Sequence, residues 1–196
     1  MTEMIDAVFD IRGDRLPAAY PFALWDELAR RVPQLGADAS VGVLPLRISG
    51  KGQEVLLPKR SKLVLRLPVA LAGHAAALVE AQLDVEGNEL QLGEMKLREI
   101  QPYPTIHAHL VTGADDETEF INALAERLGP LGVSGKWICG RRSSLIGPER
   151  AVHGYSLVLH DLKPDDSLYL QYTGLGTDRH LGCGIFVPYK VITGLD

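Results

Sequence analysis

Short alternating segments and a few amphipathic stretches make up the hydrophobic pattern of this chain. Strands are expected where apolar and polar residues alternate, and helices where apolar residues recur every three to four positions. Proline and glycine mark the ends of these segments, as Pro33 and Gly36 do after the first helical stretch. In the first hundred residues the pattern predicts strands at 4–11, 41–48, 56–57, 63–67, 83–85 and 90–97, and helices at 22–32 and 68–78.

The second half of the chain repeats this order. Strands are predicted at 105–111, 136–146, 152–159 and 185–187, and helices at 115–128 and 164–172. Two successive β-α-β-β-α-β units predict an α+β protein of two tandem ferredoxin-like domains, at 1–100 and 104–196. The proline-rich segment Gln101-Pro102-Tyr103-Pro104 is the expected linker. A Gly-rich loop precedes the last predicted strand.

That loop contains Gly174, Gly176, Gly182 and Gly184, with Arg179 and His180 between the glycines. Glycine adopts positive φ and lets a backbone approach a ligand closely, and exposed N–H groups beside a cation suit a phosphate. The glycines precede a strand, whereas a dinucleotide fingerprint follows a strand and opens a helix. The loop therefore suits a phosphate or an RNA backbone, with an ordinary surface turn as the alternative.

The composition and net charge of the chain limit the classes of function that it can have. The net charge of −5 argues against generic nucleic-acid binding, but cations and acids are segregated along the chain, so that one face can still attract a polyanion. No apolar stretch approaches the roughly 20 residues needed to span a bilayer, and the N-terminus lacks a signal core. Two isolated cysteines predict reduced thiols in a cytoplasmic protein. No cofactor and no metal site are predicted.

Four stretches, at 17–25, 41–46, 138–142 and 174–188, together make the chain resemble the repeat-associated mysterious protein (RAMP) superfamily. Within it, the chain is similar to the compact CRISPR-associated endoribonucleases that cut precursor transcripts inside their repeats. The resemblance implies cleavage without metal by attack of a ribose 2′-hydroxyl on the adjacent phosphate. The products are a 2′,3′-cyclic phosphate and a 5′-hydroxyl, and the mature CRISPR RNA is expected to stay bound.

The chain departs from this family at the expected general base. Related enzymes often carry a histidine in or just after the first helix, whereas no histidine precedes His74 here. The catalytic candidates are therefore His180, His153, Tyr20 and Arg31. The RNA-binding candidates are Arg141, Arg142, Ser143, Ser144, Gly174, Gly176, Arg179, Gly182, Gly184, Lys59, Arg60 and Lys62.

Two other readings stay open. The missing early histidine favours a noncatalytic RNA-binding subunit of a CRISPR interference complex, and the acidic balance favours a small-molecule-binding ferredoxin-like protein. The expected partner is CRISPR repeat RNA, with other interference-complex subunits and a homodimer as alternatives. No membrane partner is expected.

Overall fold

A computed structural model describes residues 1–133 and 135–189, so the end of the predicted second domain, 190–196, lies outside the described residues. The chain divides into two units. The first comprises Met1–Ile100 together with Leu145–Ala151 and Asp178–Gly182, and the second comprises Gln101–Ser144, Val152–Thr177 and the chain from Cys183. Two short segments of the second half, Leu145–Ala151 and Asp178–Gly182, thus group with the first unit, and the division into domains at 1–100 and 104–196 stays a prediction.

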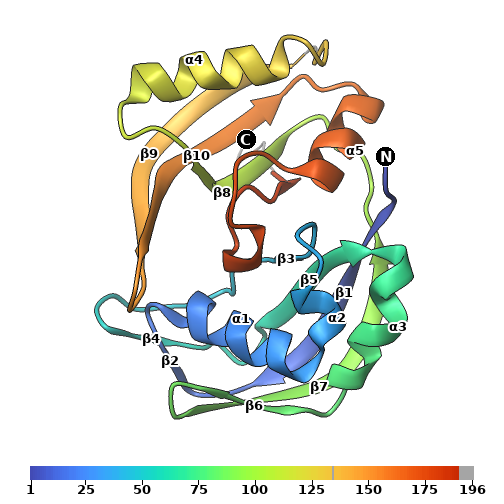
Figure 1. The fold of residues 1–196 in the computed structure, drawn as a ribbon, viewed down its shortest axis with the longest axis vertical. Coiled ribbons are helices and arrows are strands. Elements are labelled where there is room, and N and C mark those ends of the chain that lie inside the picture. Colours follow the sequence, from blue (N-terminus) through green and yellow to red (C-terminus); the bar gives the residue numbers. More distant parts are fainter. Residues whose placement is uncertain (134, 190–196) are drawn as a thin grey trace, which may run out of the picture. The chain divides into compact units, whose positions relative to one another are not determined.

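The first unit is built on a five-stranded sheet in the order β3-β5-β1-β7-β6. Strand β1 lies between β5 and β7 and is antiparallel to both. A separate two-stranded sheet pairs β2 with β4. The elements, followed in Figure 1, are β1 (Met4–Arg12), β2 (Arg15–Pro17), α1 (Tyr20–Arg31), α2 (Pro33–Gly36), β3 (Gly42–Val43), β4 (Glu54–Leu56), β5 (Lys62–Pro68), η1 (Val69–Leu71), α3 (Ala72–Ala75), η2 (Ala76–Leu78), β6 (Gln82–Val85) and β7 (Asn88–Glu99).

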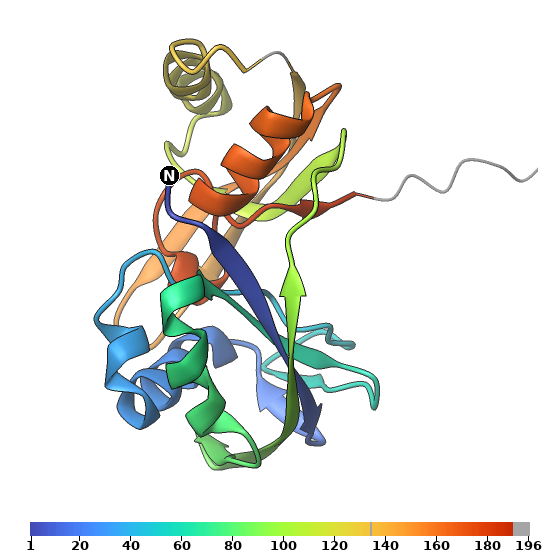
Figure 2. The ribbon, with the colours of Figure 1, turned by 90° about the vertical axis from the view of Figure 1, so that its right-hand side faces the viewer.

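Helices α1, α2 and α3 cover one face of this sheet, as Figure 2 shows from the side. On β1, alternate residues Ala7 and Phe9 point into the core beneath the helices. Leu24 and Leu28 of α1 are four residues apart, so they lie on one helix face and meet that core. On the other face of β1, Asp6 is buried in an ion pair with Arg66, with 2.8 Å between Oδ1 and Nε.

The second unit has a four-stranded sheet in the order β11-β8-β10-β9. Asp116 caps the start of its helix α4, and the Asp116 carboxylate accepts a hydrogen bond from the Glu119 N–H at 3.0 Å. The apolar side chains of α4 and α5 pack on the sheet in a core separate from that of the first unit. The elements are β8 (Ile106–Thr112), α4 (Glu117–Leu128), β9 (Lys136–Ile146), β10 (Ala151–His160), α5 (Pro164–Thr173), η3 (Arg179–Leu181) and β11 (Val187–Pro188), of which η3 groups with the first unit.

The structure confirms that the chain combines helices with sheets, as the predicted α+β class requires, and many elements differ from their predicted extents. The strand expected at 41–48 is limited to Gly42–Val43, because Pro45 has no N–H to continue the pairing. The helix expected at 68–78 is divided into η1, α3 and η2. The last strand begins at Val187 rather than 185. Among the described residues, no helix is long and apolar enough to cross a membrane.

Candidate active site and nucleic-acid interface

The Gly-rich loop is packed into the protein, and several of its amides are already bonded there. The Gly174 N–H donates to the Leu170 carbonyl at 2.8 Å, and the Gly184 N–H donates to the Leu110 carbonyl at 2.7 Å. Gly184 has a φ of +68°, and a Cβ there would lie 1.8 Å from the Leu175 carbonyl oxygen. At position 184 packing thus requires glycine, and contact of Gly174, Gly176, Gly182 and Gly184 with RNA stays a prediction.

Arg179 of this loop is an anchor within the first unit. Its side chain is only 9% exposed, and its Nε donates to the Ser40 carbonyl at 3.0 Å. Its two Nη atoms are buried and have no hydrogen-bond partner within the described part of the chain. Burial, with the nearby charge of Arg66, lowers the pKa of Arg179 to about 10, so the side chain remains charged at neutral pH. A direct contact from Arg179 to RNA stays a prediction.

His180 follows Arg179 in η3 and lies among aromatic and charged side chains of the first unit. Its ring centroid is 5.3 Å from that of Trp25 on α1. Burial lowers the pKa of His180, the negative charges of Asp178 and Asp26 raise it, and the positive charge of Arg150 lowers it further. The net effect is a lowered pKa, so the imidazole is neutral at pH 7 and can accept a proton.

Arg150 and Asp178 lie near His180 and are not among the candidates predicted from the sequence. Arg150 Nη2 lies 2.7 Å from Asp178 Oδ1. Arg150 comes from the tip of the β9–β10 hairpin and Trp25 from α1, more than a hundred residues away. Hydrophobic periodicity gives no sign of such a long-range contact, so the sequence pattern did not indicate that Arg150 and Trp25 lie near His180. We call His180, Trp25, Asp178 and Arg150 the η3 cluster.

A second pair of candidates meets in the second unit. Ser144 Oγ and His153 Nδ1, on the neighbouring strands β9 and β10, are 2.6 Å apart. Nearby, Arg142 Nη2 binds Asp115 Oδ1 at 2.7 Å, and this hydrogen bond lowers the pKa of Asp115. A histidine bonded to a hydroxyl can relay a proton. His153 and Ser144, both named from the sequence, are therefore brought together by the fold.

Tyr20 lies in the core of the first unit. It is 5% exposed, and its hydroxyl accepts a hydrogen bond from the Leu46 N–H at 2.8 Å. Burial raises the pKa of Tyr20 to about 12. A phenol that is enclosed and bonded to the backbone is poorly placed to exchange protons with a substrate, so this environment weighs against a catalytic role for Tyr20.

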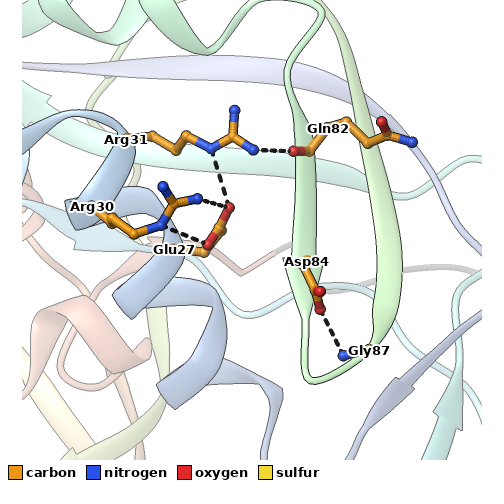
Figure 3. A network of polar contacts seen from close by, with 6 residues as sticks. All are labelled: Glu27, Arg30, Arg31, Gln82, Asp84 and Gly87. Carbon is orange, nitrogen blue, oxygen red and sulfur yellow. Dashed lines mark hydrogen bonds and ion pairs between the residues drawn. The ribbon is translucent and has the colours of Figure 1, made fainter.

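Arg31 is held in the polar network of Figure 3, at the end of α1. Its Nη2 donates to the Gln82 carbonyl on β6 at 2.6 Å, and its Nε donates to Glu27 at 3.1 Å. Arg30 forms a two-pronged hydrogen bond with the same carboxylate, and this bond is the main cause of the lowered pKa of Glu27. Arg31 thus ties α1 to the edge of the sheet, and a catalytic role for it stays a prediction.

The remaining candidate cations differ in their exposure and in their ion pairing. Lys62 on β5 is paired with Asp10 of β1, whereas Lys59 and Arg60 are exposed in the turn before β5. Arg141 is exposed on β9, next to the paired Arg142, and Ser143 beside them is partly buried. Within the described ranges, no group of three or more His, Cys, Asp or Glu side chains is arranged to hold a metal ion.

Comparison with known proteins identifies relatives along most of the chain. A family model described as Cas6 Crispr matches residues 5–191. A CRISPR-associated endonuclease Cas6 from Myxococcus xanthus (strain DK1622) is 34% identical over 186 residues, which cover 94% of this chain and 81% of that protein.

Solved structures of similar fold are more distant in sequence. A CRISPR-associated protein Cas6 aligns with a TM-score of 0.67 and 11% identity over 97% of this chain and 100% of its own. A RAMP protein that binds different RNA substrates aligns with a TM-score of 0.64 and 9% identity, over 94% and 98% of the two chains. The CRISPR endoribonuclease Cse3 bound to a 19-nucleotide RNA gives a TM-score of 0.53 and 16% identity, over 94% and 98%. These likenesses support the fold.

Proposed function

Because this chain belongs to the Cas6 family, we propose that it is an endoribonuclease that cuts precursor CRISPR RNA within its repeats and keeps the product bound. The observation that carries the proposal is the η3 cluster, in which a neutral imidazole lies beside a cation. A base for the 2′-hydroxyl and a positive charge near the phosphate each accelerate RNA cleavage by transesterification. We further infer that each unit is a variant of the ferredoxin-like fold, supported by the strand orders of the two sheets.

The proposed reaction uses the substrate's own ribose and needs no metal. The 2′-oxygen forms a bond to the adjacent phosphorus while the bond from phosphorus to the 5′-oxygen breaks. A base takes the proton of the 2′-hydroxyl, and an acid returns a proton to the departing 5′-oxygen. Positive charge near the phosphate stabilises the phosphorane-like transition state. The products are a 2′,3′-cyclic phosphate and a 5′-hydroxyl.

His180 is the leading candidate for the base. Its pKa is lowered mainly by burial, so the proton-accepting form dominates at neutral pH. Its ring is held against Trp25, which fixes its position before substrate binds. His153 is the second candidate, supported by its 2.6 Å contact with Ser144 Oγ. The exposed cations Arg141, Lys59 and Arg60 are candidates for contacts with the RNA backbone, in keeping with a salt-dependent polyanion interaction.

Two alternatives remain for this function. A noncatalytic CRISPR RNA-binding subunit is favoured by the lack of a histidine in or just after α1, since no histidine precedes His74. A small-molecule-binding protein of similar fold is favoured only by the net charge of −5.

The test is single-turnover cleavage of the cognate repeat RNA in EDTA. We expect cutting to continue in EDTA, to stop when the ribose at the cut site is 2′-deoxy, and to leave a cyclic phosphate. Strict dependence on added magnesium contradicts the proposed chemistry, binding without cutting supports the noncatalytic subunit, and no binding supports the small-molecule reading. A gel shift with the purified product tests retention.

Variants then separate the two histidines. Loss of a general acid or base typically slows a reaction by about 10²–10⁴-fold. We expect His180→Ala or His153→Ala to slow cleavage in this range without abolishing binding. His74→Ala is the matched control, because His74 is exposed on α3. If both test variants cut at the parental rate, neither histidine is the base, and Arg31 or the Ser143–Ser144 pair becomes the next candidate.

A further inference from the structure

The tip of the β9–β10 hairpin, Leu145–Ala151, folds as part of the first unit, although the strands that carry it belong to the second. The Gly147 N–H donates to the Arg150 carbonyl at 2.9 Å, which closes the tip. Gly147 packs against Phe22 of α1, where a Cβ would be 2.6 Å from the nearest ring atom. The absence of a side chain at Gly147 therefore lets the tip rest on the start of α1, and this contact brings Arg150 beside η3.

The guanidinium of Arg150 is fixed from two sides. One nitrogen binds the Asp178 carboxylate at 2.7 Å, and the central carbon lies 5.8 Å from the centroid of the Phe22 ring. The Arg150 side chain is 49% exposed, whereas that of Asp178 is only 14% exposed. An arginine has five N–H donors in a rigid fork. Part of the fork is thus held by the protein while the rest stays open to an incoming anion.

Asp178, which holds Arg150, has a backbone that most residues avoid. Its φ of +63° and ψ of +38° are left-handed, a conformation that costs a non-glycine residue free energy. Such strain is often found where a side chain must be held for function. Asp178 directly precedes η3, so this backbone also sets the direction in which Arg179 and His180 leave the loop.

We propose that Arg150 binds the scissile phosphate next to His180 and stabilises the charge that develops on its non-bridging oxygens, with Asp178 as the positioning residue. This inference rests on the proposed endoribonuclease function. The ligand class is an RNA phosphodiester, which the exposed edge of the guanidinium matches in charge and hydrogen-bonding geometry. In the free protein the negative charge of Asp178 offsets the positive charge of Arg150, and their ion pair holds the guanidinium in place.

The experiment compares Arg150→Met, Arg150→Lys and Asp178→Asn with the parent. Methionine keeps an unbranched stem against Phe22 without charge, and asparagine tolerates the left-handed backbone at 178. Arg127→Met is the control, because it removes one exposed positive charge from α4 in the other unit. Cleavage is measured in single turnover, affinity on 2′-deoxy repeat RNA, and folding by thermal melting.

We expect Arg150→Met to slow cleavage by about 10²–10³-fold, as when one oxyanion donor is removed, while affinity changes by less than about tenfold. Arg150→Lys should recover part of the rate because it restores the charge. Asp178→Asn should slow cleavage less than Arg150→Met, because the fork is then present but less well held.

The pH dependence of the rate gives a second readout. The charged groups that act on His180 are Asp178 on its own loop, Asp26 on α1 and Arg150 on the hairpin tip. The cleavage rate should rise with pH as His180 loses its proton and then reach a plateau. Removal of the Arg150 charge raises the pKa of His180 and should move this rise to higher pH. Removal of the Asp178 charge lowers that pKa and should move the rise to lower pH. A merely structural role would not shift the two variants in opposite directions.

Three results would overturn the inference. The first is cleavage by Arg150→Met within about threefold of the Arg127→Met control. The second is a loss of affinity as large as the loss of rate, which would place Arg150 in general RNA binding. The third is an unchanged pH profile in both variants. If the parent protein itself does not cut, the proposed function and this inference both fail. If the parent cuts and one of these three results is found, only this inference fails.

Discussion

Gly184→Ala tests whether the glycines of the loop serve packing or RNA contact. Gly184 has positive φ, and a Cβ would lie 1.8 Å from the Leu175 carbonyl oxygen. The same residue exchanges backbone hydrogen bonds with its neighbours: its N–H donates to Leu110 at 2.7 Å, and its carbonyl accepts from the Leu175 N–H at 3.1 Å. A methyl group cannot be accommodated without displacing one of these segments, so the substitution should destabilise the second unit.

The magnitude follows from these contacts. A left-handed backbone costs an alanine about 1–2 kcal/mol, and each strained hydrogen bond costs about 1 kcal/mol. With the steric displacement added, we expect the free energy of unfolding to fall by about 3–5 kcal/mol. For a protein of this size each kcal/mol lowers Tm by roughly 2–4 °C, so Tm should fall by roughly 6–20 °C.

The assay is thermal unfolding followed by circular dichroism, with repeat-RNA affinity measured well below the transition. Gly73→Ala is the control, because Gly73 lies in α3 with open space around its Cβ position, and it should gain about 0.5–1 kcal/mol. A Gly184→Ala protein that melts within about 2 °C of the parent but loses RNA affinity would refute the packing argument. The loop glycines would then serve the RNA.

Two further predictions concern candidates named from the sequence. Tyr20→Phe removes the acceptor of the Leu46 N–H and should cost about 1–3 kcal/mol of stability without slowing cleavage by the folded protein. Because burial raises the pKa of Tyr20 to about 12, its stabilisation is complete below pH 10 and is lost as pH rises toward 12; alkaline melting curves of parent and variant check this. A rate loss of tenfold or more in folded Tyr20→Phe would restore Tyr20 as a catalytic candidate. Arg141→Ala should reduce the salt slope of RNA binding by about one, and Arg142→Ala by less, because Arg142 is already paired with Asp115. Unchanged affinity and slope in the folded double variant would exclude the hairpin as the RNA surface.

The elements that depend on local periodicity were predictable from the sequence. Helix α4 is one such case, since Phe120, Leu124 and Leu128 recur at four-residue intervals and all are buried. The β9–β10 hairpin is another, with β9 at the predicted bounds. The short β3 and the broken helix after Pro68 were less predictable, because pairing and packing with distant residues decide where such weak elements end.

The candidate site was predictable only in part, for the same reason. His180 and Arg179 stood out because they lie between glycines, and Ser144 and His153 because they lie on one hairpin. Nothing local reveals that Arg179 is buried against Ser40, or that Arg150 binds Asp178. These contacts join segments that are far apart in sequence, and their residues do not differ in type from ordinary surface charges.

The placement of the loop changes what its glycines mean. In the sequence they suggest an open backbone that wraps a phosphate, whereas in the structure the amides of Gly174 and Gly184 are bonded within the protein. Gly182 has positive φ at the end of η3, and Arg179 binds the Ser40 carbonyl; η3 thus lies where His180 contacts Trp25. Under the proposed function we therefore expect side chains to supply positive charge at the phosphate, and contact of the loop glycines with RNA stays a prediction. Arg150 is the cation of the η3 cluster that is both fixed and half exposed, which is why its substitution is the sharper test of the chemistry.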